Sequence, residues 1–396
     1  MVPEEWKDTK MGAVFSSRRE KGRKGLPTLS VTLNDGLVPR DDLERKMETN
    51  LSAEEHLLVR PGDIAYNMMR MWQGASGLCS EEAIVSPAYI VLEPNNQIDP
   101  IFASYLFKLS RTVHNFWAYS YGLTNDRLRL YFRDFSMVPL GLPPMSEQKR
   151  IAEILETWDR AIETIEKLIA NSQTQKKALM QQLLTGKKRL PGFDGEWKAE
   201  KLSNLCTVRR GASPRPISSP KWFAEHGRGW IRISDVTGSA TERLEKTDQY
   251  LSQEGEDKSV KVDPGDLVMS ICATIGVPKF IGIPACIHDG FVVFREVSPN
   301  LDLGFLYYIL EEATERLANS GQPGTQKNLN TTIVGNISVP IISCDEQEKI
   351  VQILRAADQI VRDLASKRQA LEAEKAALMQ QLLTGKRRVK IEESAA

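Results

Sequence analysis

Apolar side chains recur at alternating spacings of four and three residues along two long stretches of this chain. The first seam runs from Ile151 to Leu183 and the second from Ile350 to Leu382, and the flanking positions are rich in Glu, Lys, Gln and Arg. No Pro or Gly interrupts either run. The pattern therefore predicts two amphipathic helices with heptad seams, each roughly 60 Å long at about 1.5 Å per residue.

The two stretches are copies of one pattern. Glu147-Gln148 at the start of the first recurs as Glu346-Gln347, and the closing Leu-Leu-Thr-Gly at Gly186 recurs at Gly385, at a constant offset of 199 residues. A repeat of this length indicates a duplicated unit in which a globular segment is followed by a helix.

Capping signals mark the ends of both helices. Ser146 is the expected N-cap of the first helix, and Asp345 with Glu348 fits a capping box at the start of the second. Gly186 and Gly385 stand where a left-handed helix end belongs.

Helices with so narrow an apolar stripe must pair. Two copies joined through a whole domain would lie antiparallel, so we expect an intramolecular antiparallel coiled coil, and pairing with helices of other proteins is the alternative. The basic clusters 187–189 and 386–388 follow the helices. They indicate either DNA contacts or complementation of the negative helix C-termini, and the second interpretation is favoured.

The duplication extends into the globular segments. Trp6-Lys7 recurs as Trp197-Lys198 at an offset of 191 residues, and Pro61-Gly62-Asp63 recurs as Pro264-Gly265-Asp266 at an offset of 203. Insertions therefore accumulate in the globular halves while the helices keep their length. Such a pattern suits two domains of one fold that are adapted to different targets.

Short alternating or apolar runs bounded by turn residues predict strands in both halves. The expected strands cover residues 62–67, 84–92, 230–236, 265–271 and 290–294, and short helices are expected at 101–109 and 303–318. The fold class is therefore expected to be α+β, with two α+β domains, two long paired helices and an internal pseudo-two-fold repeat.

Composition narrows the class of protein. The 396 residues allow two or three domains, and 52 Lys and Arg balance 52 Asp and Glu, which excludes a uniformly cationic coat for nucleic acid but not local basic patches. Apolar runs too short for a membrane and an N-terminus unlike a signal peptide predict a cytoplasmic protein. Five cysteines without a C-x-x-C pair, and four histidines, are expected to be reduced thiols and isolated imidazoles, without a metal site.

The patterns expected of an enzyme are missing. The sequence has no phosphate-binding G-x-x-x-x-G-K-[ST] loop, no glycine-rich methyltransferase loop and no Asn-Pro-Pro-Tyr string. Asp63 and Asp266 stand alone in turns and are expected to bond their own backbone, and His288-Asp289-Gly290 is expected to be a β-turn. The chain is therefore interpreted as a binding protein without catalytic residues.

Donor side chains cluster in segments that suit nucleic acid. Arg and Lys contact phosphates, and Arg, Asn and Gln also make bidentate contacts to base edges. The alternatives are a solvated surface loop for the first basic stretch and core packing for the methionines around Asn67. The candidate DNA-binding residues are Arg18, Arg19, Lys21, Arg23, Lys24, Asn67, Arg70, Gln73, Thr124, Asn125, Arg127, Arg209, Arg210, Arg232, Gln322, Thr325, Gln326, Lys327 and Asn328.

The order of these motifs resembles a known family over essentially the whole chain. Each half ends in a turn, a Pro-containing strand and a Glu-Gln helix that closes in Leu-Leu-Thr-Gly-Lys, and 230–235 and both Pro-Gly-Asp turns add to the match. The chain resembles the specificity subunit of type I restriction-modification systems. The scaffold motifs do not fix base-contacting residues, which rest on the physical argument above.

The resemblance implies two target-recognition domains that each read one half of a bipartite DNA site, with paired helices that set the gap. It implies two methyltransferase (modification) subunits that carry S-adenosylmethionine, and motor-nuclease (restriction) subunits that use ATP and Mg. No cofactor is expected on this chain itself.

The expected domains follow from the helix boundaries. They are target-recognition domain 1 (1–145), spacer helix 1 (146–186), target-recognition domain 2 (187–344), spacer helix 2 (345–385) and a C-terminal tail (386–396). The competing hypothesis is a coiled-coil scaffold that binds only protein, and a third is a stand-alone methyltransferase or nuclease.

Overall fold

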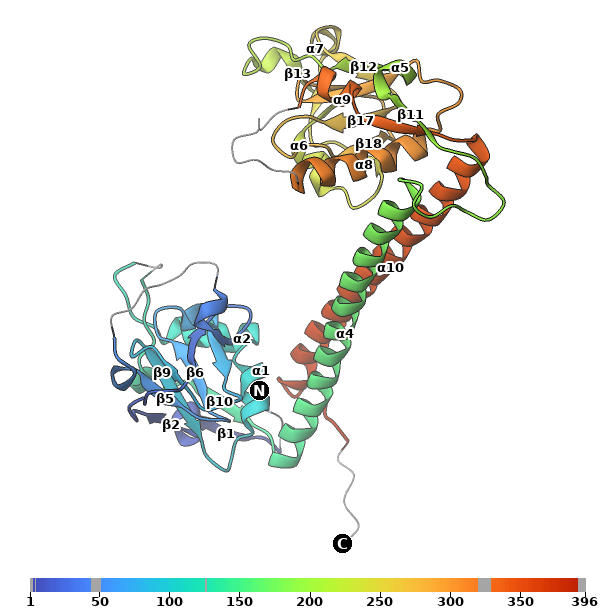
Figure 1. The fold of residues 1–396 in the computed structure, drawn as a ribbon. Coiled ribbons are helices and arrows are strands. Elements are labelled where there is room, and N and C mark those ends of the chain that lie inside the picture. Colours follow the sequence, from blue (N-terminus) through green and yellow to red (C-terminus); the bar gives the residue numbers. More distant parts are fainter. Residues whose placement is uncertain (1–2, 4, 44–50, 125–126, 320–328, 391–396) are drawn as a thin grey trace. The chain divides into compact units, whose positions relative to one another are not determined.

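The computed structural model describes residues 3, 5–43, 51–124, 127–319 and 329–390. The chain divides into two compact units, which we call unit 1 (Met1–Ile165 with Lys367–Ala396) and unit 2 (Glu166–Ser366). Each unit combines one globular domain with a part of each long helix (Figure 1).

The globular domain of unit 1 is built from short strands in three sheets. One sheet contains, in order, β2 (Phe15–Arg18), β9 (Tyr89–Pro94), β6 (Ile64–Asn67) and β7 (Ser76–Leu78). A second contains β4 (Leu37–Pro39), β3 (Thr28–Val31), β8 (Ala83–Val85) and β5 (Leu57–Val59). The third pairs β1 (Lys7–Lys10) with β10 (Pro139–Leu142).

Short helices cover these sheets. They are α1 (Pro100–Leu106), α2 (Ser110–Ala118), α3 (Phe132–Phe135), and the 3-10 turns η1 (Met11–Ala13), η2 (Arg40–Asp42), η3 (Ala53–Glu55) and η4 (Met71–Gln73). Buried aromatic rings join the helices to β6, with Phe107, Phe116 and Phe135 in mutual edge or stacked contact at centroid distances of 5.3 to 5.9 Å. Such ring contacts add to the area that the core removes from water.

The globular domain of unit 2 is also built from three sheets. Its larger sheet contains β12 (Thr207–Arg210), β20 (Phe291–Arg295), β17 (Leu267–Ser270), β18 (Pro278–Ile281) and β14 (Arg243–Leu244). A second contains β15 (Tyr250–Leu251), β13 (Phe223–Ile231), β19 (Ala285–Ile287) and β16 (Val260–Val262), and a third pairs β11 (Lys198–Lys201) with β21 (Ser338–Ile341). Its helices are α5 (Leu202–Leu205), α6 (Ile233–Gly238), α7 (Gln253–Asp257), α8 (Leu303–Asn319), α9 (Thr331–Gly335) and η5 (Pro220–Trp222).

The strand registers of the two units correspond. Lys7 lies opposite Leu142 in unit 1, and Lys198 lies opposite Ile341 in unit 2. These pairs keep the sequence offsets of 191 and 199 residues, so the equivalences read from the sequence also hold for strand pairing.

The two predicted long helices are present as α4 (Met145–Leu183) and α10 (Cys344–Leu382), each of 39 residues. In unit 1 the end of α10 lies against the start of α4, where Leu382 and Leu383 join the core of Ile151 and Leu155. In unit 2 the equivalent contact joins Leu183 and Leu184 of the α4 end to Ile350 and Leu354 of α10. Counting at alternating spacings of four and three from Ile151 and from Ile350 gives ten seam positions in each helix, of which Arg368 is one. These positions are buried or half-buried, except Arg368, which is exposed.

The helix starts differ from the prediction. Both helices begin earlier than expected, so Ser146 and Asp345 lie inside the first turn and are not the N-caps. At α10 the Ser343 hydroxyl instead accepts the Glu346 N–H at 3.3 Å. The predicted ends are confirmed, because Gly186 and Gly385 have φ values of 71° and 69°.

Most of the short predicted elements are confirmed within a few residues at their ends. The main error is the strand expected at 230–236: β13 ends at Ile231 and the helix α6 follows it. The stretch 84–92 also contains a turn that separates β8 from β9. None of the described helices is long and apolar enough to cross a membrane.

Candidate nucleic-acid interface

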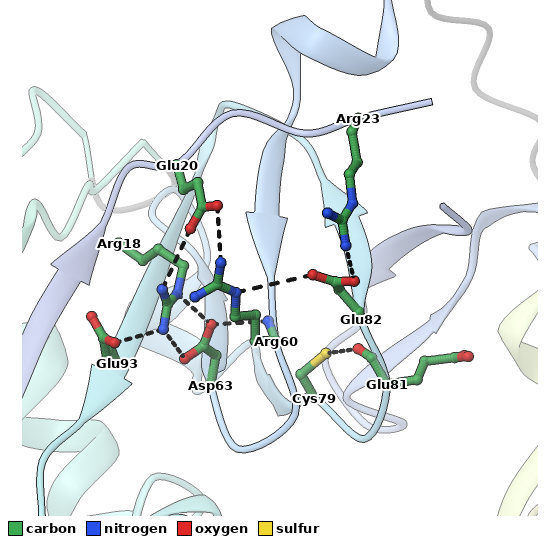
Figure 2. A network of polar contacts seen from close by, with 9 residues as sticks. All are labelled: Arg18, Glu20, Arg23, Arg60, Asp63, Cys79, Glu81, Glu82 and Glu93. Atoms are coloured by element: carbon green, nitrogen blue, oxygen red, sulfur yellow. Dashed lines mark hydrogen bonds and ion pairs between the residues drawn. The ribbon is translucent and has the colours of Figure 1, made fainter. Parts of the chain in front are cut away.

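The Pro-Gly-Asp turn of unit 1 is held by a buried ion pair. Asp63 accepts the Arg60 backbone N–H at 2.9 Å, which confirms the predicted bond to its own turn. The same carboxylate also accepts from the Arg18 guanidinium at 2.8 and 3.2 Å, as Figure 2 shows. Asp63 is 3% exposed and the Arg18 side chain 12%, so this pair is shielded from water.

More carboxylates surround the same guanidinium. Glu93 lies 2.7 Å from Arg18, and Glu20 bridges Arg18 and Arg60 at 3.7 and 2.9 Å (Figure 2). The hydrogen bond with Asp63 raises the pKa of the Arg18 guanidinium, so it stays charged. Arg18 is therefore engaged with carboxylates of its own domain, and its predicted phosphate contact stays a prediction.

The rest of the first basic stretch is exposed. Arg23 forms an ion pair with Glu82, whereas Arg19, Lys21 and Lys24 present exposed side chains. An exposed pair of this kind contributes little to stability and breaks at little cost. These four residues keep the position expected of phosphate-contacting groups.

The structure brings two other predicted segments of unit 1 together. The Leu130 N–H donates to the Met68 carbonyl at 2.8 Å, and the Tyr66 hydroxyl donates to the Leu130 carbonyl at 3.1 Å. The turn after β6 therefore lies beside the loop closed by the backbone pairing of Tyr121 with Arg129.

These adjacent loops present polar side chains to solvent. Arg70, Gln73, Thr124 and Arg127 are exposed, whereas the Asn67 side chain accepts the Met69 N–H at 3.0 Å and shapes its own turn. Asn125 lies outside the described residues.

Unit 2 has the equivalent backbone bond at Leu329, the first described residue after the corresponding segment. The Leu329 N–H donates to the Ile271 carbonyl at 2.9 Å, at the positions that correspond to Leu130 and Met68. The predicted residues of the preceding loop lie outside the described residues: Gln322, Thr325, Gln326, Lys327 and Asn328.

A cluster of arginines surrounds the predicted turn at Asp289 in unit 2. The turn is confirmed by the Phe291 N–H bond to the His288 carbonyl at 3.0 Å. The Asp289 carboxylate accepts from Ser213 at 2.6 Å and Arg215 at 3.0 Å, and its carbonyl accepts from Arg210 at 2.7 Å.

Beside this turn lies a cavity of about 410 Å³, with Arg215, Trp230, Arg232 and His288 in its lining. Burial lowers the pKa of His288, so its imidazole is neutral at neutral pH, and the hydrogen bond from Ser213 lowers the pKa of Asp289. Arg232 is exposed at its rim. The arrangement offers hydrogen-bond donors of the kind that contact phosphates and base edges.

Arg215 lines this cavity but is not among the candidates predicted from the sequence. The basic run was followed only to Arg210, although the same polar and glycine-containing segment continues through Ser213 to Arg215. The segment from Arg209 to Arg215 has the same length as the stretch from Arg18 to Lys24 in unit 1. This equal length is the feature of the sequence that could have identified Arg215.

The Glu-Gln motif at the start of each long helix has a structural role. Glu147 is fully buried and accepts from Arg388 at 2.7 Å, and Glu346 accepts from Arg189 at 2.9 Å. One arginine of each basic cluster therefore binds the first turn of the other long helix. This contact was not predicted, because its partners lie far apart in the sequence.

The second residue of the motif fixes the adjoining loop. Gln148 accepts the Asp99 N–H and donates to the Gln97 and Pro143 carbonyls at 2.8 to 2.9 Å. Gln347 makes the equivalent bonds in unit 2, with Asp302, Asn300 and Ile342.

The described residues contain no group of three or more His, Cys, Asp or Glu side chains placed to hold a metal ion. The five cysteines are free, and burial raises the pKa of the Cys79, Cys206 and Cys286 thiols to about 11. Thiols with such pKa values are poor nucleophiles at neutral pH.

Comparison with known proteins supports a single family. The model of the type I restriction modification DNA specificity domain matches residues 40–171 and 194–373. The MjaVIII specificity subunit, part of a type I restriction enzyme of Methanocaldococcus jannaschii, is 25% identical over 424 residues, which cover 98% of this chain and 94% of that protein.

Solved structures share the fold. A chain from a study of complex assembly and conformational transition of the type I R-M system aligns with a TM-score of 0.64 and 19% identity. The HsdS subunit from Thermoanaerobacter tengcongensis aligns with a TM-score of 0.51 and 19% identity. Both alignments cover 97% of this chain and 98% of the other.

Proposed function

This chain belongs to the type I restriction modification DNA specificity family, and from this membership we propose that it is a non-catalytic subunit that reads a bipartite DNA site. The globular domain of unit 1 reads one half of the site and that of unit 2 reads the other. The observation that carries the proposal is the duplicated architecture with divergent loops: each domain has the same strand registers but different polar groups on its exposed segments.

In unit 1 the proposed reading surface is the pair of adjacent loops after β6 and before Leu130. Arg70, Gln73 and Arg127 are exposed there and have the donor geometry that discriminates guanine and adenine edges. Exposed Thr124 belongs to the same proposed surface, and Asn125 is proposed with it from the sequence alone. Exposed Arg19, Lys21, Arg23 and Lys24 supply salt-dependent phosphate contacts.

In unit 2 the proposed surface consists of Arg209, Arg210 and Arg232 with the cavity beside Asp289. The predicted loop residues Gln322, Thr325, Gln326, Lys327 and Asn328 are proposed as further DNA contacts from the sequence alone.

The helices α4 and α10 are proposed to form the antiparallel coiled coil that sets the gap between the half-sites. The packing of Leu382 on Ile151 and of Leu183 on Ile350 supports this, because each contact joins the end of one helix to the start of the other. Removing seven residues, one heptad, from each helix shortens the spacer by about 10 Å, which corresponds to roughly three base pairs.

The chain is proposed to act in a complex. Two methyltransferase subunits that carry S-adenosylmethionine bind the helices and domains, and motor-nuclease subunits that use ATP and Mg join them for cleavage. The catalytic groups are proposed to reside on these partners.

DNA retention by the chain together with methyltransferase subunits tests the proposal. We expect selection from a random duplex pool to return two fixed half-sequences with a fixed gap, and shortening both helices by one heptad to reduce that gap. The competing scaffold function predicts no sequence-selective retention, and methylation by the purified chain alone would contradict the non-catalytic assignment.

The placement of the reading surface needs a separate test. Replacing Asn125 and Arg127 with Ala should weaken binding by about tenfold to a hundredfold through one half-site and leave the other half unchanged. Lys149→Ala, which removes an exposed cation of α4, is the matched control and should preserve both. Unchanged binding at both half-sites in the loop variant would refute this placement.

A further inference from the structure

The two lysines that interrupt the apolar seams lie in matched polar networks. In unit 1, Lys375 of α10 forms an ion pair with Asp159 of α4 and lies 5.1 Å from the ring centre of Tyr105 on α1. The Tyr105 hydroxyl donates to the same aspartate at 2.5 Å. Three elements, two long helices and one helix of the globular domain, therefore meet at one carboxylate.

Unit 2 repeats the arrangement with the helices exchanged. Lys176 of α4 lies 2.7 Å from Asp358 of α10 and 5.7 Å from the ring centre of Tyr308 on α8. The Tyr308 hydroxyl donates to Asp358 at 2.7 Å. We call these two sets of residues the Tyr–Asp–Lys triads.

The lysines are shielded although they are charged. Their side chains are 14% and 19% exposed for Lys176 and Lys375. Desolvation disfavours the charge of Lys176, but the carboxylates of Glu311 and Asp358 outweigh it and raise the pKa of the ammonium group. Both lysines therefore form ion pairs at seam positions where an apolar side chain would need no charged partner.

Such polar residues in a coiled-coil seam cost stability and specify register. Apolar contacts are non-directional, so the leucine and isoleucine cores do not by themselves select one register. A hydrogen bond and an ion pair to one carboxylate are satisfied in one register only.

We propose that the Tyr–Asp–Lys triads are positioning residues that lock each reading domain to one register on the helices and thereby fix the gap between the half-sites to a single base-pair number. The proposal rests on the bipartite reading proposed above. A slip of one helical turn moves a domain by about 5.4 Å, whereas successive base pairs are about 3.4 Å apart, so even one turn changes the gap that is read.

The test replaces both seam lysines by Met in the complex of the full chain with its methyltransferase subunits. The binding of duplexes with the native gap, and with one base pair more or less, is measured. The original protein should prefer the native gap by about tenfold or more. The Lys176→Met, Lys375→Met variant should lose most of that preference while it stays folded and binds each half-sequence as before, although its Tm falls because Asp159 and Asp358 lose their cation. A cooperative thermal transition above the assay temperature shows that the variant is folded, and this separates loss of gap preference from unfolding.

Two further variants frame this experiment. Tyr105→Phe with Tyr308→Phe removes only the two hydroxyls and should also relax the gap, which keeps the test valid if the methionine variant fails to fold. Glu372→Gln is the matched control, because it breaks an exposed pair with Arg368 on α10 and should retain the full gap preference.

The outcomes separate this proposal from the proposed function. A triad variant that keeps the native gap preference refutes the register lock and leaves bipartite reading intact. An original protein with no preference for paired half-sites refutes bipartite reading itself. A control variant that relaxes the gap as much as the triad variants would also overturn the proposal.

Discussion

The two globular domains hold the same turn with cations from different strands. In unit 1 Asp63 pairs with Arg18 of β2, whereas in unit 2 Asp266 pairs with Arg295 of β20 at 2.7 Å. The residue equivalent to Arg18 is Arg209, which lies opposite Val293 as Arg18 lies opposite Val91, and its side chain is exposed. In both units the turn pairs a carboxylate with a cation, but the cation comes from a different strand in each. Arg209 is therefore not needed for the turn of unit 2, and its side chain is available for another contact.

The short helices of the globular domains also differ between the two units. Unit 2 has one continuous helix, α8, where unit 1 has α1 and α2. Glu311 of α8 adds a second carboxylate to Lys176, and the equivalent residue in unit 1 is Lys108, which donates instead to the Leu33 and Gly74 carbonyls. Both units therefore keep the Tyr–Asp–Lys triad, whereas the residues near it differ.

The largest expected effect concerns the two equivalent arginines. Arg18→Met leaves the buried Asp63 without its cation and should lower the free energy of unfolding by about 3 kcal/mol. Arg209→Met should change it by less than about 0.5 kcal/mol, because that side chain is exposed. Urea unfolding of both variants measures the difference. Equal losses of unfolding free energy would show that Arg18 and Arg209 contribute equally to stability.

The second effect tests the cation that replaces Arg18 in unit 2. Arg295→Met should cost about 1 to 2 kcal/mol, less than Arg18→Met, because Asp266 is 19% exposed and water partly compensates the loss. The same urea titration applies. A larger loss than for Arg18→Met would contradict the ranking by burial.

A smaller effect separates the two equivalent tryptophans. Trp6 donates to Glu147 at 3.1 Å, whereas the buried Trp197 indole N–H has no hydrogen-bond partner among the described residues. Trp6→Phe should therefore cost about 1 kcal/mol, and Trp197→Phe should be neutral or slightly stabilising. Thermal unfolding compares them, and a loss of stability in Trp197→Phe beyond that in Trp6→Phe would overturn the assignment.

The smallest effect is a pH dependence confined to unit 2. Burial lowers the pKa of His288 below its ordinary value of 6.5, so the folded state binds fewer protons than the unfolded chain. His288 therefore contributes stability above pH 6.5 that is lost as the pH falls through its folded pKa. The protection factors for hydrogen exchange of β19 and β20, which correct for the slower intrinsic exchange at lower pH, should fall on acidification in the original protein and less so in His288→Gln. An identical pH response in the two proteins would exclude His288 as the cause.

Sequence alone was sufficient for the features that depend on local pattern. The heptad seams, their glycine ends and the turns at Asp63 and Asp289 arise from neighbouring residues, and all of them are present. The N-cap of α10 was misplaced because Ser343 and Asp345 both suit that role, and only the backbone decides between them.

The features that sequence could not give are contacts between distant strands and helices. Arg18 belongs to a basic run that suggests phosphate binding, and only the fold places it 2.8 Å from Asp63. In the sequence, the seam lysines only interrupt the apolar pattern. In the structure, they form ion pairs with Asp159 and Asp358. Charge pattern identifies cations, whereas tertiary structure determines which of them remain exposed.

Mapping of modified bases across a genome tests the central claim most directly. The chain is expressed with its methyltransferase subunits in a host that lacks other modification systems, and single-molecule sequencing locates the modified positions. Reading by two domains predicts one motif of two specific half-sequences separated by a gap of fixed length and free sequence. A single continuous motif, or modification without a motif, would contradict reading by two domains held at a set distance.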